Sequence, residues 1–180
     1  MMKRFQYFSF GLMFLAGLAC SLISLPQPSN VPSSSPTLGN ASDTENSALV
    51  NIYDPARNPA DDLRQAIVLA QKENKRIMLE LGGNWCIWCK YIDDFYASHA
   101  DILQYRAENY ILVKVNVSEE NSNEKFLSQF PAVHGYPHIY ILDGNGTFLH
   151  SQDTAELEDG NISYVPEVFM AFLQKWASQK

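Results

Sequence analysis

The sequence predicts a single α/β domain, and three observations lead to that prediction. Apolar, strand-like runs alternate with amphipathic helical stretches in the order α-β-α-β-α-β-β-α. The chain has 180 residues, 46% of them hydrophobic, which is enough to bury one core. Two cysteines separated by two residues, Cys86 and Cys89, stand where the strand-like run 76–82 gives way to a helical stretch. We therefore expect a domain at residues 51–180, preceded by segments of a different kind.

Residue patterns place the elements of this domain. Pro59 and Asp61 open a helix whose apolar residues recur at helical spacing, namely Leu63, Ala66, Ile67 and Ala70. Strands are predicted at 76–81, 110–117, 138–142 and 147–150, the last two pairing antiparallel across the turn 144–146. Further helices are predicted from about residue 86 or 88 to 97, at 101–108, at 123–130 and from Pro166. The last helix carries a wide apolar stripe expected to pack on the sheet: Val165, Val168, Phe169, Phe172, Leu173 and Trp176.

The first 25 residues predict an export signal. Lys3 and Arg4 form a short basic region, an apolar stretch runs from about 5 to 25, and no charged residue occurs between Arg4 and Asp43. Residues 26–50 are rich in Pro, Ser, Asn and Thr, so we expect a flexible linker. The protein is therefore expected to be exported, either to the periplasm or to a membrane anchor that faces the periplasm or cell surface.

Cys20 leaves three ways of processing this signal open. Small residues, Gly17 and Ala19, precede it and suit ordinary signal cleavage. Residues 15–20 also resemble a bacterial lipobox, in which the cysteine becomes lipidated, although Gly17 stands where leucine is preferred. An uncleaved anchor is the third alternative, because about 20 apolar residues can span a bilayer.

Cysteine usage and charge narrow the function. Outside the signal region only Cys86 and Cys89 remain, so the pair is expected to be catalytic and not part of a structural disulfide scaffold. The formal net charge is −7 and no basic stripe is present, which argues against nucleic acid as a partner.

A Cys-x-x-Cys at a strand-to-helix junction favours redox chemistry. The unpaired N–H groups and partial positive charge of a helix N-terminus stabilise a thiolate, which is the nucleophile in disulfide exchange. Half of a zinc site has the same spacing, but structural zinc normally takes four protein ligands. His134 and His138 have a suitable spacing yet straddle a Gly-Tyr-Pro turn. We predict no metal.

Several motifs in order along the chain resemble the thioredoxin-like superfamily. They are Trp85-Cys86-Ile-Trp88-Cys89-Lys90, Glu80 six residues before the first cysteine, Lys114-Val-Asn116, Gly135-Tyr136-Pro137 and the turn 143–146. The resemblance covers about 58–180 and is greatest to exported bacterial members. It implies a thioredoxin-like fold, with a mixed central sheet and helices on both faces.

Position and resemblance together suggest roles for the site residues. Cys86 stands first at the helix N-terminus, where its sulfur is expected to be exposed and to attack, and Cys89 is expected to be more buried and to resolve the mixed disulfide. Burial favours the neutral form of a carboxyl group, so Glu80 would exchange protons with Cys89 near neutral pH. The alternative is a strand-end glutamate that reaches solvent. Lys114 either pairs with Glu80 or lies at a sheet edge.

The resemblance also implies a substrate-binding surface. Pro137 is expected to be cis and to place the Tyr136 backbone beside the sulfurs. Trp85 is expected to form a platform, whereas Trp88 stands where many thioredoxins have proline. His138 either faces the substrate or is an ordinary strand residue.

The predicted function is thiol:disulfide oxidoreduction, in which Cys86 and Cys89 reduce disulfides of exported proteins. Disulfide oxidation or isomerisation is one alternative, and a non-catalytic module that binds a partner or Cu(I) is another. We expect no cofactor beyond the redox disulfide, protein thiols and disulfides as substrates, an electron donor that the sequence does not identify, and a monomer.

Overall fold

The computed structural model describes residue 49 and residues 51–178. The predicted signal, Cys20 and nearly all of the predicted linker lie outside these residues. In chain order the elements are α1 (Pro59–Glu73), β1 (Arg76–Gly82), α2 (Ile87–Ser98), α3 (Ala100–Asn109), β2 (Tyr110–Asn116), α4 (Glu124–Leu127), β3 (His138–Leu142), β4 (Phe148–Asp153), the short 3-10 helix η1 (Thr154–Leu157) and α5 (Pro166–Trp176). The predicted order is confirmed.

The four strands form one mixed sheet in the order β2-β1-β3-β4. β1 pairs parallel with β2 and antiparallel with β3, and β3 pairs antiparallel with β4. The register places Glu80 of β1 directly opposite Lys114 of β2. Two sequence-distant charged residues are thereby brought together near the C-terminal ends of two adjacent parallel strands, the central strand β1 and the edge strand β2.

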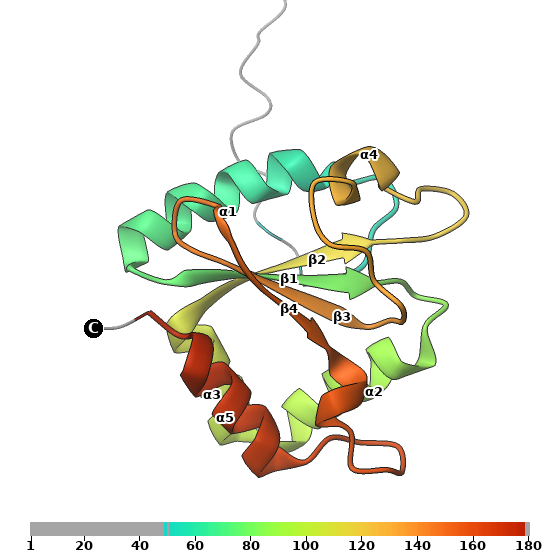
Figure 1. The fold of residues 1–180 in the computed structure, drawn as a ribbon, viewed down its shortest axis with the longest axis vertical. Helices are drawn as coiled ribbons and strands as arrows, with labels where there is room; N and C mark the ends of the chain where they lie inside the picture. Colours follow the sequence, from blue (N-terminus) through green and yellow to red (C-terminus); the bar gives the residue numbers. More distant parts are fainter. Residues whose placement is uncertain (1–48, 50, 179–180) are drawn as a thin grey trace, which may run out of the picture. The chain divides into compact units, whose positions relative to one another are not determined.

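Helices cover both faces of the sheet, as the resemblance implied (Figure 1). Side chains of β1 alternate between the faces, since successive strand residues point in opposite directions. Ile77, Leu79 and Leu81 pack with Ala66 and Ala70 of α1. Met78 packs on the other face with residues of α2, α3 and α5. Glu80 shares the face of Met78, so its carboxylate lies on the side of the sheet that α2 covers.

Three element predictions need correction. The helix expected at 123–130 is only the single turn α4: Asn123 has left-handed backbone and lies outside it, and the helix ends at Leu127. Val168, expected to face the sheet, is 43% exposed, since α5 packs along Phe169, Phe172 and Leu173 instead. β4 also runs three residues further than expected, to Asp153.

The polar segment 151–164, which had no predicted role, is built into the domain. It completes β4, forms η1, and closes with an isolated bridge between Glu158 and Tyr164. Leu157 and Tyr164 are buried in the same cluster as Phe95 and Phe169. The segment therefore covers part of the core beside the N-terminal end of α2.

Candidate active site

Cys86 and Cys89 form a disulfide at the N-terminus of α2. Cys86 is the N-cap residue of the helix, and its Sγ accepts a hydrogen bond from the Cys89 N–H at 3.1 Å. The sulfur thus occupies the position where a helix offers unpaired donors and a partial positive charge. After reduction, this environment would favour a thiolate on Cys86, which supports thiol–disulfide exchange at this sulfur.

The two cysteines differ little in exposure. Cys86 is 6% exposed and Cys89 is 2% exposed. Cys86 is the more exposed of the two, as predicted, but the expectation that Cys86 would be exposed is wrong for this disulfide form. Tyr53, Trp88 and Tyr136 pack around the pair, which accounts for its low exposure.

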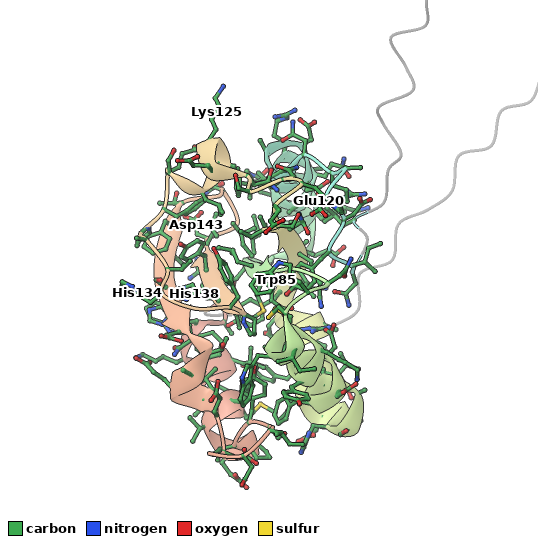
Figure 2. All side chains as sticks on the ribbon, turned by 90° about the vertical axis from the view of Figure 1, so that its right-hand side faces the viewer. Trp85, Glu120, Lys125, His134, His138 and Asp143 are labelled. Carbon is green, nitrogen blue, oxygen red and sulfur yellow. A yellow bond between two sulfur atoms is a disulfide. The ribbon has the colours of Figure 1, made fainter. Side chains whose placement is uncertain are left out.

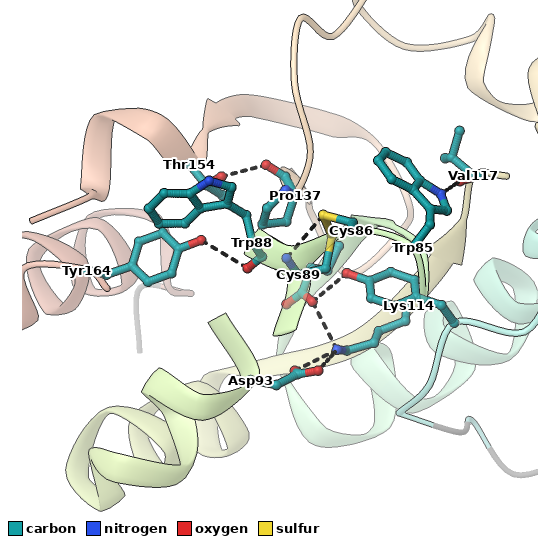
Figure 3. Close-up of a disulfide and its surroundings, with 12 residues drawn as sticks. Trp85, Cys86, Trp88, Cys89, Asp93, Lys114, Val117, Pro137, Thr154 and Tyr164 are labelled. Carbon is teal, nitrogen blue, oxygen red and sulfur yellow. Dashed lines mark hydrogen bonds and ion pairs between the residues drawn. A yellow bond between two sulfur atoms is a disulfide. The ribbon is translucent and has the colours of Figure 1, made fainter. Parts of the chain in front are cut away.

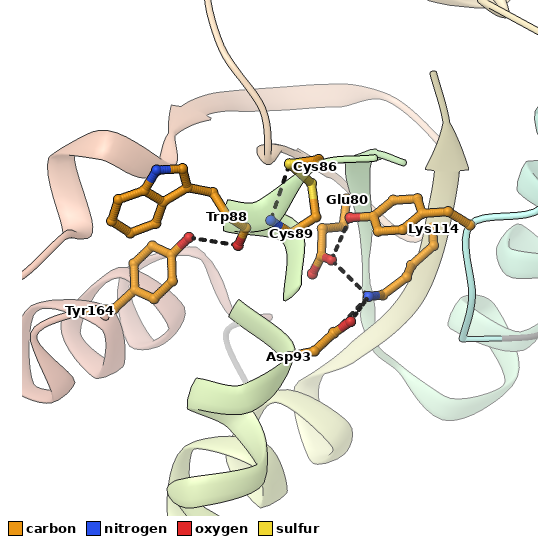
Figure 4. Close-up of polar contacts among 8 residues, drawn as sticks. Glu80, Cys86, Trp88, Cys89, Asp93, Lys114 and Tyr164 are labelled. Atoms are coloured by element: carbon orange, nitrogen blue, oxygen red, sulfur yellow. Dashed lines mark hydrogen bonds and ion pairs between the residues drawn. A yellow bond between two sulfur atoms is a disulfide. The ribbon is translucent and has the colours of Figure 1, made fainter. Parts of the chain in front are cut away.

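Beneath the disulfide lies a buried charged network (Figure 4). Glu80 is fully buried, so the alternative in which it reaches solvent is excluded. Its Oε1 lies 3.2 Å from Lys114 Nζ and accepts a hydrogen bond of 2.8 Å from the Tyr53 hydroxyl. Lys114 pairs with Glu80 and also lies on β2, an edge strand of the sheet, so both of its predicted placements hold. It also donates to both oxygens of Asp93 at 2.6 and 2.8 Å.

Two members of this network were not found from the sequence. Asp93 stands four residues after Cys89 on α2, so helical spacing could have placed it on the same face. Tyr53 precedes the first helix and the region of family resemblance, and no local pattern marks it. Burial first, and the neighbouring Glu80 carboxylate second, raise the pKa of Tyr53 well above its usual value. The hydroxyl therefore stays protonated and available as a donor.

The loop before β3 lies against the disulfide (Figure 3). The Tyr136–Pro137 peptide bond is cis, in agreement with the resemblance. The carbonyl oxygen of Pro137 accepts a hydrogen bond of 2.5 Å from the hydroxyl of Thr154, a buried residue of η1. The segment 151–164 thus holds the loop in place from behind.

His138, which follows this proline, is a buried strand residue. It is 5% exposed, and its Nε2 lies 2.7 Å from Ser151 Oγ on the neighbouring strand. Desolvation by burial lowers the pKa of His138 below its usual value. His134 is exposed, and Figure 2 shows it at the surface. Across residue 49 and residues 51–178, no group of three or more His, Cys, Asp or Glu side chains is placed to hold a metal.

The two tryptophans of the motif have different surroundings. Trp85 is 61% exposed and donates from Nε1 to the Val117 carbonyl at 2.7 Å (Figure 3). Its ring meets that of Tyr136 edge-on, with ring centroids 5.8 Å apart. Trp88 is half-buried and packs edge-on against Tyr164 at 6.1 Å. The first can present an apolar face to a ligand, whereas the second mainly covers the disulfide.

The exposed apolar surface extends to both sides of the disulfide. Ile87, between the two tryptophans of the motif, is 55% exposed. A shallow pocket adjoins the ring of Trp85 on the other side, lined by Val117, Ser118, Glu119 and Glu120.

Among the described residues, none of the helices is long and apolar enough to span a membrane.

Solved structures resemble this fold at low sequence identity. The disulphide isomerase from Xylella fastidiosa Temecula1 superposes with a TM-score of 0.59 at 19% identity, over 70% of this chain and 97% of that one. The C-terminal domain of Neisseria meningitidis DsbD, in its oxidised form, gives a TM-score of 0.50 at 12% identity, over 69% and 98% of the two chains. A family model described as thioredoxin-like matches residues 58–144. Residues 58–144 are thus similar to thioredoxin-like proteins, and the domain has a thioredoxin-like fold.

Curated relatives that this chain matches are thiol:disulfide interchange proteins. DsbD of Escherichia coli (strain K12) is 31% identical over 86 residues, which are 48% of this chain and 15% of that protein. DsbD of Salmonella typhi is 31% identical over 91 residues, 51% of this chain and 16% of that protein. The match therefore spans only about a sixth of the length of each relative.

Proposed function

We propose that this protein is a thiol:disulfide oxidoreductase that reduces disulfides of exported proteins. The observation that carries the proposal is the Cys86–Cys89 disulfide at the N-terminus of α2, placed above the buried Glu80–Lys114 pair. Similarity to thiol:disulfide interchange proteins supports the same chemistry. The direct test is catalysis of insulin-disulfide reduction by dithiothreitol. A rate equal to that of dithiothreitol alone would contradict the proposal.

In the proposed cycle the reduced protein acts through Cys86. Its thiolate attacks one sulfur of a client disulfide, which forms a mixed disulfide and releases the other client sulfur as a thiolate. Cys89 then loses its proton, with Glu80 as the acceptor, and attacks the Cys86 sulfur. The bond between Cys86 and the client breaks, the client leaves with the electron pair, and the Cys86–Cys89 disulfide remains. A thiol donor restores the reduced pair.

The surface around the disulfide suits an extended protein segment. Trp85 and Tyr136 form an exposed aromatic ledge, with Trp88 closing the other side. Pro137 lies next to the sulfurs, and its ring offers no N–H that would compete for backbone pairing. We assign the backbone of Tyr136 to pairing with the client and the two tryptophans to apolar contacts.

Reduction is proposed over oxidation or isomerisation because the Trp-Cys-x-x-Cys-Lys motif with a buried Glu80 is most like thioredoxin. The reduction potential of the Cys86–Cys89 couple decides between them: a value near that of thioredoxin supports reduction, and a much more oxidising one favours the alternative. A Cu(I)-binding module predicts stoichiometric metal uptake without insulin reduction, which the same preparation can exclude.

Glu80→Gln is expected to slow resolution of the mixed disulfide about a hundredfold at neutral pH, a typical contribution of a positioned general base. The first attack by Cys86 should be little affected, because the substitution preserves the size of the side chain and acts beneath Cys89. Rapid-mixing kinetics measure both steps. Glu108→Gln, on the exposed surface of α3, is the matched control. An unchanged pH–rate profile in Glu80→Gln would assign Glu80 a purely structural role.

We further propose that the protein is exported and that Cys20 is lipidated, so that the linker 26–50 tethers the domain to the membrane. Intact mass of the mature protein tests this. A polypeptide that starts at Cys20 with added acyl mass is the expected result. An unmodified start at Cys20 would indicate a freely exported protein, and an intact Met1 would indicate an uncleaved anchor.

A further inference from the structure

The hydroxyl of Tyr53 is bonded to one oxygen of the buried carboxylate beneath the disulfide. It donates to Glu80 Oε1 at 2.8 Å, and Lys114 Nζ approaches the same oxygen at 3.2 Å. The other oxygen, Glu80 Oε2, is buried and has no hydrogen-bond partner among the described residues. Two donors on one oxygen fix the plane of the carboxylate and leave the second oxygen for another group.

Cys89 is the cysteine that lies beside this carboxylate. Figure 4 shows the Glu80 carboxylate on the inner side of the disulfide, between Cys89 and Lys114. A Cβ built on Gly82 would lie 2.3 Å from Cys89 Sγ and 2.9 Å from the Tyr53 hydroxyl oxygen, so both atoms approach the same point of β1. In the disulfide Cys89 has no proton to donate, whereas the reduced thiol has one for Oε2.

Hydrogen bonds hold the backbone at Tyr53 and just after it. Asn84, just before the cysteines, donates from Nδ2 to the Tyr53 carbonyl at 3.1 Å. Asn121, beyond β2, donates to the Pro55 carbonyl at 2.8 Å. Tyr53 itself is 5% exposed, and Lys114 Nζ lies 4.6 Å from the centre of its ring. A segment that lies before the family-matched region 58–144 thus supplies a fixed donor to the site.

We infer that Tyr53 is a positioning residue for proton transfer during resolution of the mixed disulfide. Its hydrogen bond to Oε1 stabilises the charged carboxylate and directs Oε2 to the Cys89 thiol. The thiol proton passes to Oε2 as the Cys89 sulfur attacks Cys86, and the bond from Cys86 to the client breaks, with the electron pair going to the client sulfur. The inference rests on the proposed function, because it assigns a residue to one step of that cycle.

The test separates the two steps with dithiobis(nitrobenzoate) as the disulfide probe. Attack by Cys86 on the probe releases the first thionitrobenzoate, and attack by Cys89 on the mixed disulfide releases the second. In Tyr53→Phe the first phase is expected to be unchanged. The second phase is expected to be about tenfold slower at neutral pH, because hydrogen bonds to charged groups are the stronger ones. Its pH profile should move to higher pH, since loss of a donor disfavours the carboxylate.

Several titratable or charged groups surround Glu80 and contribute to the pH profile of the second phase. They are Tyr53 itself, Lys114 on β2, Asp93, Cys89 and Tyr96 on α2, and Tyr164 before α5. A double-mutant cycle isolates the contribution that Tyr53 makes to the rate of the second phase through Glu80. If Tyr53 acts through Glu80, Tyr53→Phe should add no further slowing of the second phase in a Glu80→Gln background.

Tyr110→Phe is the matched control, since it also removes a buried hydroxyl. This hydroxyl donates to the Leu173 carbonyl at 2.6 Å, and Tyr110 lies four strand positions before Lys114. Both phases should be unchanged in it. Two results would overturn the inference, provided that both thionitrobenzoates are still released. One is a second-phase rate in Tyr53→Phe equal to that of the wild type. The other is that Tyr53→Phe slows the second phase equally in the wild-type and the Glu80→Gln backgrounds. Failure of the wild type to release them would instead refute the proposed function.

Discussion

Cys86→Ser is expected to abolish disulfide reduction, whereas Cys89→Ser should accumulate mixed disulfides with clients through Cys86. A serine hydroxyl at position 86 is not ionised at neutral pH, so no nucleophile remains at the helix N-terminus. In Cys89→Ser the first attack still occurs, but no thiol is available to release the client. Insulin reduction measures the first result, and non-reducing electrophoresis with mass spectrometry of the trapped adducts measures the second.

Alkylation and adduct trapping test which cysteine attacks the client and which resolves the mixed disulfide. Alkylation of the reduced protein should label Cys86 faster, because its sulfur caps the helix and is the less buried of the pair. Ser98→Ala, at the far end of α2, serves as a control that should leave both alkylation and turnover unchanged. Faster labelling of Cys89, or adducts trapped in Cys86→Ser, would exchange attacker and resolver.

Lys114→Met is expected to lower the free energy of unfolding by about 3–5 kcal/mol, because it leaves a buried carboxylate without its cation. The Lys114 side chain is 1% exposed and that of Glu80 is fully buried, so water cannot replace the lost partner. Tyr53 alone would remain on Oε1. Urea denaturation followed by circular dichroism gives the difference.

Two further variants test that explanation. Lys90→Met removes a lysine of similar size from an exposed ion pair with Asp94, and it should change stability little. Combining Lys114→Met with Glu80→Gln should recover part of the loss, since no unpaired charge then stays buried. A loss in Lys114→Met no larger than in Lys90→Met would contradict a stabilising role for the buried pair.

The sheet and its helices could be predicted because their signals are local. Continuous apolar runs located β1 and β3, period-3.6 patterns located α1 and α5 within a few residues, and a single carboxylate in an apolar strand marked Glu80. The pairing of Glu80 with Lys114 depended on strand register, which residue patterns alone left open. Burial of Cys86 depends on Tyr53 and Tyr136, which come from two distant segments, so helix position could not reveal it.

The missed features depend on tertiary contacts. Tyr53 has no neighbouring motif, and only the folded domain brings its hydroxyl to Glu80. The segment 151–164 is polar enough to suggest a surface loop, yet Thr154 and Tyr164 point inward to the carbonyls of Pro137 and Trp88. A residue that acts by a single long-range hydrogen bond leaves no periodic signal in the sequence.

The placement of Thr154 and Tyr164 bears on how this domain can be divided or transplanted. Both residues lie beyond the region 58–144 that family similarity identifies, as do β4 and α5, and Tyr53 lies before it. A fragment cut at those boundaries would expose one edge of β3 and uncover the apolar face that Phe169 and Leu173 cover. For truncation, domain fusion or chimeras with other redox proteins, the smallest exchangeable unit therefore extends at least from Tyr53 to Trp176.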